Sequence, residues 1–428
     1  MRWNNCWAKR RHWPNSLANK SGSMYLRIFF NSVKKLINEH DKKVFLCIAL
    51  IYSINIVRFA GSTDFTTHKE YSPFYVSDFS AFLTSAYIIK DDNAGNLYNL
   101  NTQRKYLNEV IKPYKRGEVV LTYRNPPLLA FLFLPYTLIE PILAFKVYVF
   151  VSSMVVFLGI FILTRKLKLK STYFAIIASI FYSTISTLIT GQLGSYLLLI
   201  LCLIYVNILE NRYTQAGLLS TLLLFKPQYA LLIPLIWIAL RFNKSYLKAV
   251  ILGGIVFIIA NFLIFGSNPF PEYISFLYYS ETYNMGTDIE KNYSLLSLLS
   301  VFTSNPLSIT LIVSALLYIL FLLLYITKKN NRKILLFTGI LIILPLAVHV
   351  NLADLIMSLV PLIFFVSEYN RSGNTKYLYS VIIIYLIPYI YLANIVWLGG
   401  LLYFLVIALI LKPSNSISLP NTTPHPNS

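Results

Sequence analysis

The chain has 428 residues, of which 56% are hydrophobic and only 13% are charged, and its mean hydropathy is +0.61. Soluble domains carry about 25% charged residues, so this composition excludes an ordinary soluble enzyme. The formal net charge of +20 is, in such a chain, first a signal of membrane orientation and not of nucleic-acid binding. Three cysteines occur, Cys6, Cys47 and Cys202, so neither a disulfide framework nor a cysteine metal site is expected. The sequence predicts an all-α polytopic membrane protein.

The distribution of basic residues predicts how the chain enters the membrane. Residues 1–43 form a basic segment ahead of the first apolar run, residues 44–59. This places the N-terminus in the cytoplasm and makes the run a retained span and not a cleaved signal peptide. Met24 is an alternative start, because the residues before it have no evident structural role. A second basic cluster at residues 165–170 is also expected inside, so residues 61–140 form a large extracytoplasmic loop.

Apolar runs along the remaining chain predict a helical bundle. The run at residues 128–138, entered through Pro126 and Pro127, is too short to cross a core of about 30 Å and predicts an interfacial or re-entrant helix. Residues 216–240 carry positive charge on both flanks and predict a hairpin of two short helices that meet near Lys226. Further spans are expected at residues 143–163, 173–190, 196–209, 247–265, 309–326, 334–348, 352–366, 377–393 and 396–411.

This map contains about twelve spans in an integral membrane domain of residues 44–411, with both termini in the cytoplasm. The tail, residues 412–428, is rich in Pro, Ser, Asn and Thr and is expected to be disordered. The cytoplasmic links are short, and no phosphate-binding loop follows a strand. No cluster of His, Asp or Glu has dependable metal spacing. Chemistry is therefore expected at the outer face of the membrane, without a metal, a cofactor or cytosolic ATP at the site.

The unusual polar residues of the chain collect on, or just below, the outer face of this map. Three of them have two interpretations each. Asp78 is either the cap of a juxtamembrane helix or a catalytic carboxylate. Lys226 is either a functional cation near the membrane plane or a side chain that snorkels to the headgroups. His349 is either a polar helix end or a ligand-binding group.

Several short motifs follow one another along residues 44–365. In chain order they are Asp78-Phe79, Gly95-Asn96-Leu97-Tyr98, Tyr123-Arg124-Asn125-Pro126-Pro127 through Leu134-Pro135, Gly191-Gln192, Ala216-Gly217-Leu218 to Lys226-Pro227, Asn292-Tyr293-Ser294, and His349 with Asp354. Each motif is weak by itself, but their order resembles glycosyltransferase family 87, the polyprenol-phosphate-mannose-dependent mannosyltransferases of the GT-C class. The resemblance implies a GT-C-type bundle with a large first extracytoplasmic loop.

The resemblance also implies a reaction at the outer face of the plasma membrane. A sugar, mannose in the family, would move with inversion from a polyprenyl-phosphate donor to a hydroxyl of a glycolipid or glycan acceptor. Asp78 is implied as the base that takes the acceptor proton. The lipid tail of the donor would lie in a groove between spans, with the short helices after Pro127 as one wall. Candidates for binding the donor phosphate are Lys226, Arg124 and His349, and candidates for binding the sugar or the acceptor are Gln192, Asn292 and Tyr123.

Two other functions stay open at this point. Discontinuous short helices and an intramembrane lysine are also typical of a transporter or flippase for lipid-linked sugars. Alternating access needs polar groups along a path to both faces, whereas the polar residues here gather at one face. An inactive scaffold of the same fold is the third interpretation.

Overall fold

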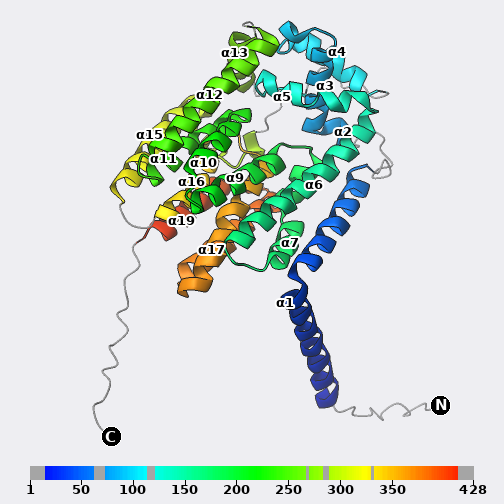
Figure 1. The fold of residues 1–428 in the computed structure, drawn as a ribbon, viewed down its shortest axis with the longest axis vertical. Coiled ribbons are helices and arrows are strands. Elements are labelled where there is room, and N and C mark those ends of the chain that lie inside the picture. The colour runs from blue at the N-terminus through cyan, green and yellow to red at the C-terminus, as the bar shows by residue number, and fades with distance from the viewer. Residues whose placement is uncertain are drawn as a thin grey trace, which may run out of the picture.

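The structure is a computed structural model that describes residues 15–61, 73–112, 121–266, 269–282, 289–328 and 332–412. Every regular element within these ranges is a helix, and no strand occurs there (Figure 1). The predicted all-α architecture is therefore confirmed for this part of the chain. Outside the described ranges lie residues 1–14, residues 62–72 and 113–120 of the predicted outer loop, residues 267–268, 283–288 and 329–331, and residues 413–428 of the predicted tail.

The helices that make up the bundle are α1 Asn15–Gly61, α6 Pro141–Lys166, α7 Ser171–Ile180, α8 Tyr182–Ile189, α9 Gly194–Leu209, α10 Tyr213–Ser220, α11 Leu232–Ala239, α12 Lys244–Phe265, α15 Pro306–Thr327, α16 Arg332–Leu346, α17 Leu359–Ser372, α18 Thr375–Leu386 and α19 Leu398–Leu411. Shorter helices outside it are α2 Pro73–Val76, α3 Asp78–Lys90, α4 Leu100–Val110, α5 Pro127–Leu132, α13 Pro269–Thr282 and α14 Leu295–Ser300. The 3₁₀ helices are η2 Ala94–Asn96, η3 Leu134–Leu138, η4 Thr221–Phe225, η5 Pro227–Leu231, η6 Ile289–Lys291, η7 Leu352–Ser358 and η8 Ile387–Ala393.

Six helices of the described residues are long and apolar enough to cross a membrane, or seven if the bent pair α7 and α8 counts as one span. Four shorter apolar helical segments accompany them: α9, α10 with η4, η5 with α11, and α19. Each of the predicted runs therefore coincides with helical structure. The figure of about twelve spans stays a prediction, because several segments are shorter than a bilayer requires.

Two of the apolar helical segments are interrupted by a break in the helix. The helical segment that begins at Tyr213 ends at Phe225, and a second one begins at Pro227. Between them Lys226 leaves the helical conformation, with φ −134° and ψ 89°, because the residue before a proline is pushed toward extended geometry. The predicted pair of short helices meeting at Lys226 is thus confirmed. The second break lies between α7 and α8, which are bent by 66°.

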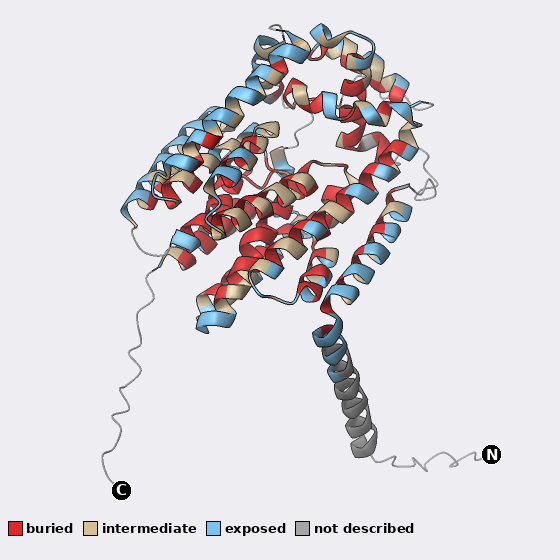
Figure 2. Ribbon diagram, in the orientation of Figure 1, coloured by how far each residue is buried: buried red, intermediate tan, exposed pale blue. Residues whose placement is uncertain are grey.

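The bundle has a buried centre and exposed outer helices (Figure 2). In the segment formed by η7 and α17, 78% of the apolar window is buried, whereas in α12 only 11% is. Exposed leucines and isoleucines cover α12 and α15. In a membrane protein such surfaces face lipid, because lipid tails solvate them as well as a protein core does. We therefore assign α12, α15 and α1 to the periphery and α16 and α17 to the core.

Basic side chains gather at one end of the bundle. Figure 1 shows α3, α4, α5 and α13 together at the upper end. At the other end, Lys166 forms an ion pair with Glu210 at 2.9 Å, and the Lys170 ammonium donates to the Asn38 carbonyl at 3.2 Å. Lys376 likewise reaches the carbonyls of Ile410 and Lys412, at 3.4 and 3.3 Å. Basic clusters that the charge pattern assigns to one side are therefore neighbours in space.

The packing of α10 on α12 gives a test of the fold. A Cβ at Gly217 would come within 2.5 Å of the Tyr246 carbonyl oxygen and 2.8 Å of Ala249 Cβ, whereas a Cβ at Gly254 meets nothing within 4 Å. We expect Gly217→Ala to lower the free energy of unfolding by about 1–3 kcal/mol, and Gly254→Ala to leave it unchanged or slightly raised. Thermal unfolding of the purified variants in detergent measures both. Equal stability of the two variants would contradict this packing.

Candidate active site

A cavity of about 660 Å³ opens at the upper end of the bundle. Five of the seven predicted site residues line it, although they come from five separate parts of the chain: Asp78, Arg124, Gln192, Lys226 and His349. All five side chains are partly exposed. The structure therefore brings together one carboxylate, two cations, an amide and an imidazole around a space that is large enough for a small-molecule ligand.

Asp78 stands at the first position of α3, directly after the N-cap residue Ser77. The Asp78 backbone N–H donates to the Thr190 carbonyl at 2.8 Å, and its carboxylate accepts a hydrogen bond from the Gln192 side chain. Gly191 makes this approach possible. Its φ is +65°, and a Cβ there would lie 2.6 Å from Phe79 Cβ. The two predicted motifs Asp78-Phe79 and Gly191-Gln192 are thus in direct contact.

Lys226 forms an ion pair with Asp354. Only 14% of the Lys226 side chain and 1% of the Asp354 side chain are exposed. Asp354 also belongs to a capping box at the start of η7, in which its other carboxylate oxygen accepts from the Asn351 backbone N–H at 3.0 Å. A buried carboxylate needs such partners, because an unpaired charge in the interior is strongly destabilising. The helix break at Lys226 therefore directs this ammonium toward both Asp354 and the cavity.

The loop that carries His349 is held from two sides. Asn292 is fully buried, and its amide donates to the Val348 carbonyl at 2.7 Å and accepts from the Val350 N–H at 3.1 Å. The Gln228 side chain donates to the His349 carbonyl at 2.8 Å. His349 Nε2 lies 3.2 Å from the Asn351 side-chain amide. These bonds fix the loop between α16 and η7 at the wall of the cavity.

The electrostatic surroundings keep the His349 imidazole uncharged. Burial and, after it, the positive charge of Arg124 lower the pKa of His349 from 6.5 to about 3. Asp354 opposes this shift, and Lys226 adds a smaller lowering effect. A neutral imidazole has one N–H donor and one acceptor nitrogen. Near neutral pH, His349 can therefore offer a ligand a hydrogen bond but not a positive charge.

Tyr123 and Arg124 are neighbours in sequence but differ in position. Tyr123 is buried, its hydroxyl donates to the Pro126 carbonyl at 2.7 Å, and its backbone N–H donates to the Gln103 side chain at 2.9 Å. Arg124 lines the cavity, and its Nε donates to Thr122 Oγ1 at 3.1 Å. Tyr123 and Asn292 are absent from the cavity lining, and their contacts support the segments that carry Arg124 and His349. A role of either residue in binding sugar stays a prediction.

The cavity continues along an apolar wall formed by α13 and α15. Its residues on these two helices are Tyr273, Leu277, Tyr278, Leu307, Leu311, Ser314, Ala315 and Tyr318. The short helices after Pro127, expected as one wall, contribute none of the described lining residues. They pack against other elements, since the Leu128 N–H donates to the buried Asn261 side chain of α12 at 3.0 Å.

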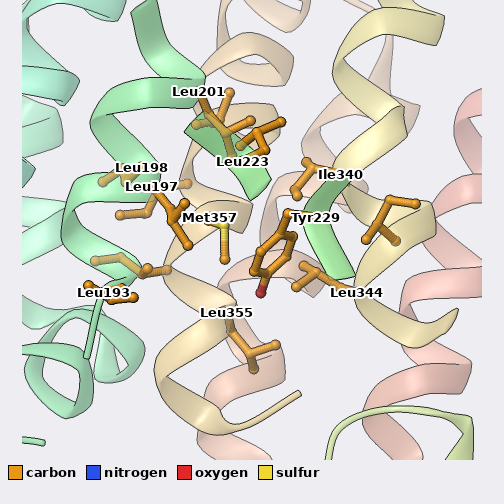
Figure 3. Close-up of a cluster of buried hydrophobic side chains, with 14 of the residues drawn as sticks. Leu193, Leu197, Leu198, Leu201, Leu223, Tyr229, Ile340, Leu344, Leu355 and Met357 are labelled. Atoms are coloured by element: carbon orange, nitrogen blue, oxygen red, sulfur yellow. The ribbon is translucent and has the colours of Figure 1, made fainter. Parts of the chain in front are cut away.

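An apolar cluster lies around Tyr229 (Figure 3). Tyr229, one turn after Lys226, is fully buried there, and its ring centre lies 5.7 Å from the Lys226 ammonium. Leucines of α9, Ile340 and Leu344 of α16, and Met357 of η7 surround it. Close packing of this kind resists displacement of the backbone, so the cluster fixes the position of the broken helix beneath the cavity.

Sequence reasoning missed several residues of this site. Asp354 was named only as part of the His349 motif and was given no role, although an acidic residue inside an apolar run calls for a cationic partner. Tyr273 and Ser314 line the cavity, and their buried hydroxyls have no hydrogen-bond partner among the described residues. Buried polar groups are usually satisfied, so these two hydroxyls point to a ligand or to water. Their sequence positions carry no signal, since Tyr and Ser are common in apolar helices.

The fold and the cavity define a membrane-embedded helical protein with a polar site at one end of its bundle. The model of glycosyltransferase family 87 matches residues 123–350, just over half of the chain, and the chain belongs to this family. It is therefore a glycosyltransferase, as the motif order indicates. The matched region contains Arg124, Gln192, Lys226 and His349, and Asp78 lies ahead of it. No curated protein matches the chain.

The lowered pKa of His349 predicts a pH-dependent stability. Below pH 6.5 the unfolded chain takes up a proton at this residue and the folded chain does not, so acid favours unfolding. Between pH 7 and pH 5 we expect a loss of about 1–2 kcal/mol from this residue. Thermal unfolding in detergent at the two pH values should show a smaller decrease for His349→Gln than for the wild type. His40→Gln, at an exposed position, should behave as the wild type, and equal decreases in all three proteins would contradict the assignment.

Proposed function

We propose that the protein is an inverting glycosyltransferase that moves a sugar, mannose by family resemblance, from a polyprenyl-phosphate donor to a hydroxyl of a glycolipid or glycan acceptor. The observation that carries the proposal is the cavity itself. It places the Asp78 carboxylate, the Lys226 and Arg124 cations and an apolar wall around one space. A lipid phosphate sugar presents the matching groups: an anion, hydroxyls and a hydrocarbon chain.

Asp78 is the proposed base. The acceptor oxygen attacks C1 of the donor sugar while the bond from C1 to the phosphate oxygen breaks, and the acceptor proton passes to Asp78. The phosphate leaves with the bonding electrons as polyprenyl phosphate, and attack from the opposite side inverts C1. Gln192, which donates to the carboxylate, keeps it aimed at the cavity and is also placed to contact sugar hydroxyls.

The leaving phosphate gains negative charge during this step, so nearby donors and cations stabilise the transition state. Lys226 and Arg124 supply the charge in the proposed site, and neutral His349 supplies a hydrogen bond. The Asp354 partner limits the cost of holding Lys226 in a partly buried position before the donor arrives. Tyr273 and Ser314 offer hydroxyls for the sugar or the phosphate, and the α13 and α15 wall accepts the first part of the lipid tail. Asn292 and Tyr123 contribute to substrate binding through the segments that they support.

The proposed orientation puts the cavity on the outer face of the plasma membrane, with both termini in the cytoplasm and about twelve helical segments in the membrane. The support is the gathering of basic side chains at the end of the bundle opposite to the cavity, since basic clusters favour the cytoplasmic side. A lipid phosphate sugar already carries its leaving group, so the reaction draws on no cytosolic nucleotide and, by this proposal, on no metal.

The proposed base can be tested by replacement with its amide. Asp78→Asn keeps the shape and can still accept the Gln192 hydrogen bond, but it cannot take a proton. We expect turnover to fall by a factor of about 100 or more, with the thermal unfolding midpoint unchanged. Transfer of label from polyprenyl-phosphate mannose to native lipid extract in purified membranes measures the rate. Asp92→Asn, in the exposed turn that follows α3, is the matched control.

Near-normal turnover of Asp78→Asn would overturn the assignment of the base. If even the wild type transfers no label, other polyprenyl-phosphate sugars are supplied in the same membranes. Transfer from one of them would correct the sugar and keep the mechanism. Translocation of labelled donor across vesicles, with no product from any donor, would favour the flippase instead.

The role of Lys226 can be separated from that of its partner. Removing Lys226 alone would leave Asp354 buried without a counter-charge, so we compare the double variant Lys226→Met/Asp354→Asn with Asp354→Asn. We expect the donor KM of the double variant to be about tenfold higher and the acceptor KM to be the same within about twofold. Initial rates at varied donor and acceptor concentrations give both constants, with Lys105→Met on exposed α4 as a control for lost charge. An unchanged donor KM would mean that Lys226 serves only the ion pair.

A further inference from the structure

A second cavity lies at the basic end of the bundle, away from the site described above. It has a volume of about 580 Å³ and is lined by residues 38–43 of α1 and by residues of the turn that joins α6 to α7. The two cavities stand at opposite ends of α6: Phe145, near its start, packs against Phe79 with ring centres 5.6 Å apart, whereas Arg165, near its end, lines the second cavity. We call this second cavity the basic cleft.

Specific contacts hold the two walls of the basic cleft together. α1 bends at His40, which has a non-helical φ of −129° and ψ of 30°. The next residue, Asp41, is 8% exposed, and its two carboxylate oxygens accept from the backbone N–H groups of Ser171 and Thr172 at 3.2 and 3.0 Å. The Thr172 hydroxyl donates to the Asp41 carbonyl at 2.9 Å. The walls are therefore fixed relative to one another.

The charge of the basic cleft is strongly positive. Five of its lining residues are cationic, all with exposed side chains: Lys42, Lys43, Arg165, Lys168 and Lys170. Two lining residues are acidic, and Asp41 uses its carboxylate on the N-terminus of α7. Among the described residues, no ion pair includes any of the five cations. The cleft therefore presents an unneutralised positive field to any anion that enters it.

The position of the basic cleft indicates that the anion comes from the membrane. Three membrane-spanning segments have one end at the cleft. These are the start of the span Lys35–Ala60, the end of the span Pro141–Lys166 and the start of the bent pair at Ser171. Apolar side chains next to it face outward on the adjoining helices, with Leu46 51% exposed on α1 and Ile176 43% exposed on α7. A phospholipid in the bilayer would place its phosphate at this level and its acyl chains along these side chains, as in basic pockets between membrane helices.

We propose that the basic cleft binds the headgroup of an anionic membrane phospholipid. The bias of basic residues toward the cytoplasmic side accounts for their sign and number, but it requires neither a cleft nor walls joined by the Asp41 cap. The lipid would tie α1 to the α6–α7 turn at the end opposite to the glycosyltransferase site. This proposal does not depend on the substrate proposed for that site.

The test uses the full-length protein in detergent and two double variants. Lys42→Gln/Lys168→Gln removes two cleft charges and keeps the Asp41 cap, and Lys244→Gln/Lys248→Gln removes two charges at the start of α12, outside the cleft. Binding of phosphatidylglycerol and of phosphatidylcholine is measured by native mass spectrometry, with elution as a single species required of each protein. We expect affinity for phosphatidylglycerol to fall about fivefold for each cleft lysine removed and by less than about twofold in the α12 variant.

Three results would overturn the proposal. The first is equal loss of phosphatidylglycerol binding in both double variants, and the second is equal binding of the two phospholipids by the wild type. The third is displacement of phosphatidylglycerol by soluble glycerol phosphate at comparable concentration, which would make the ligand a free phosphate ester. If Lys42→Gln/Lys168→Gln does not elute as a single species, Lys43→Gln/Arg165→Gln replaces it with the same expected results.

Discussion

The arrangement of the site depends on one buried ion pair, Lys226 with Asp354. A charge in this setting is tolerated only with a close partner, so the pair joins the break between two half-length helices to the start of η7. The capping box at Asn351 connects Asp354 to the loop of His349, and Asn292 and Gln228 hold that loop in place. The ion pair thereby sets the position of one side of the cavity relative to Asp78 on the other side.

Most of the fold could be predicted from the sequence because membrane helices appear in it as long apolar runs. Long apolar runs predicted α6, α12 and α15, and positive charge on both flanks of residues 216–240 predicted the two short helices that meet near Lys226. The basic clusters that the sequence assigns to one side of the membrane do lie close together at one end of the bundle. Helix length was the weaker inference, since α9 and α19 are apolar but too short to span a bilayer unaided.

The candidate site was predictable where a residue type was out of place in its surroundings. Asp78, Lys226 and His349 stand out in an apolar chain, and all three line the cavity. Asn292 and Tyr123 were selected because they belong to the motifs, but they support other segments because their hydrogen bonds are used within the protein. Tyr273 and Ser314 gave no signal, since only tertiary packing shows that their hydroxyls lack partners. Polarity thus predicted which segments lie near the cavity better than it predicted which side chains line it.

The unbroken length of α6 has a consequence for the membrane around the protein. From Phe145 to Lys166 the helix rises about 31 Å, close to the thickness of a bilayer's hydrocarbon layer. One end is locked into the aromatic packing beneath Asp78 and the other into the basic turn. The helix cannot shorten, so a thinner or thicker bilayer must be accommodated by tilt of the whole bundle or by deformation of the surrounding lipid. Hydrophobic mismatch would then act on both cavities at once, because the same rod separates them.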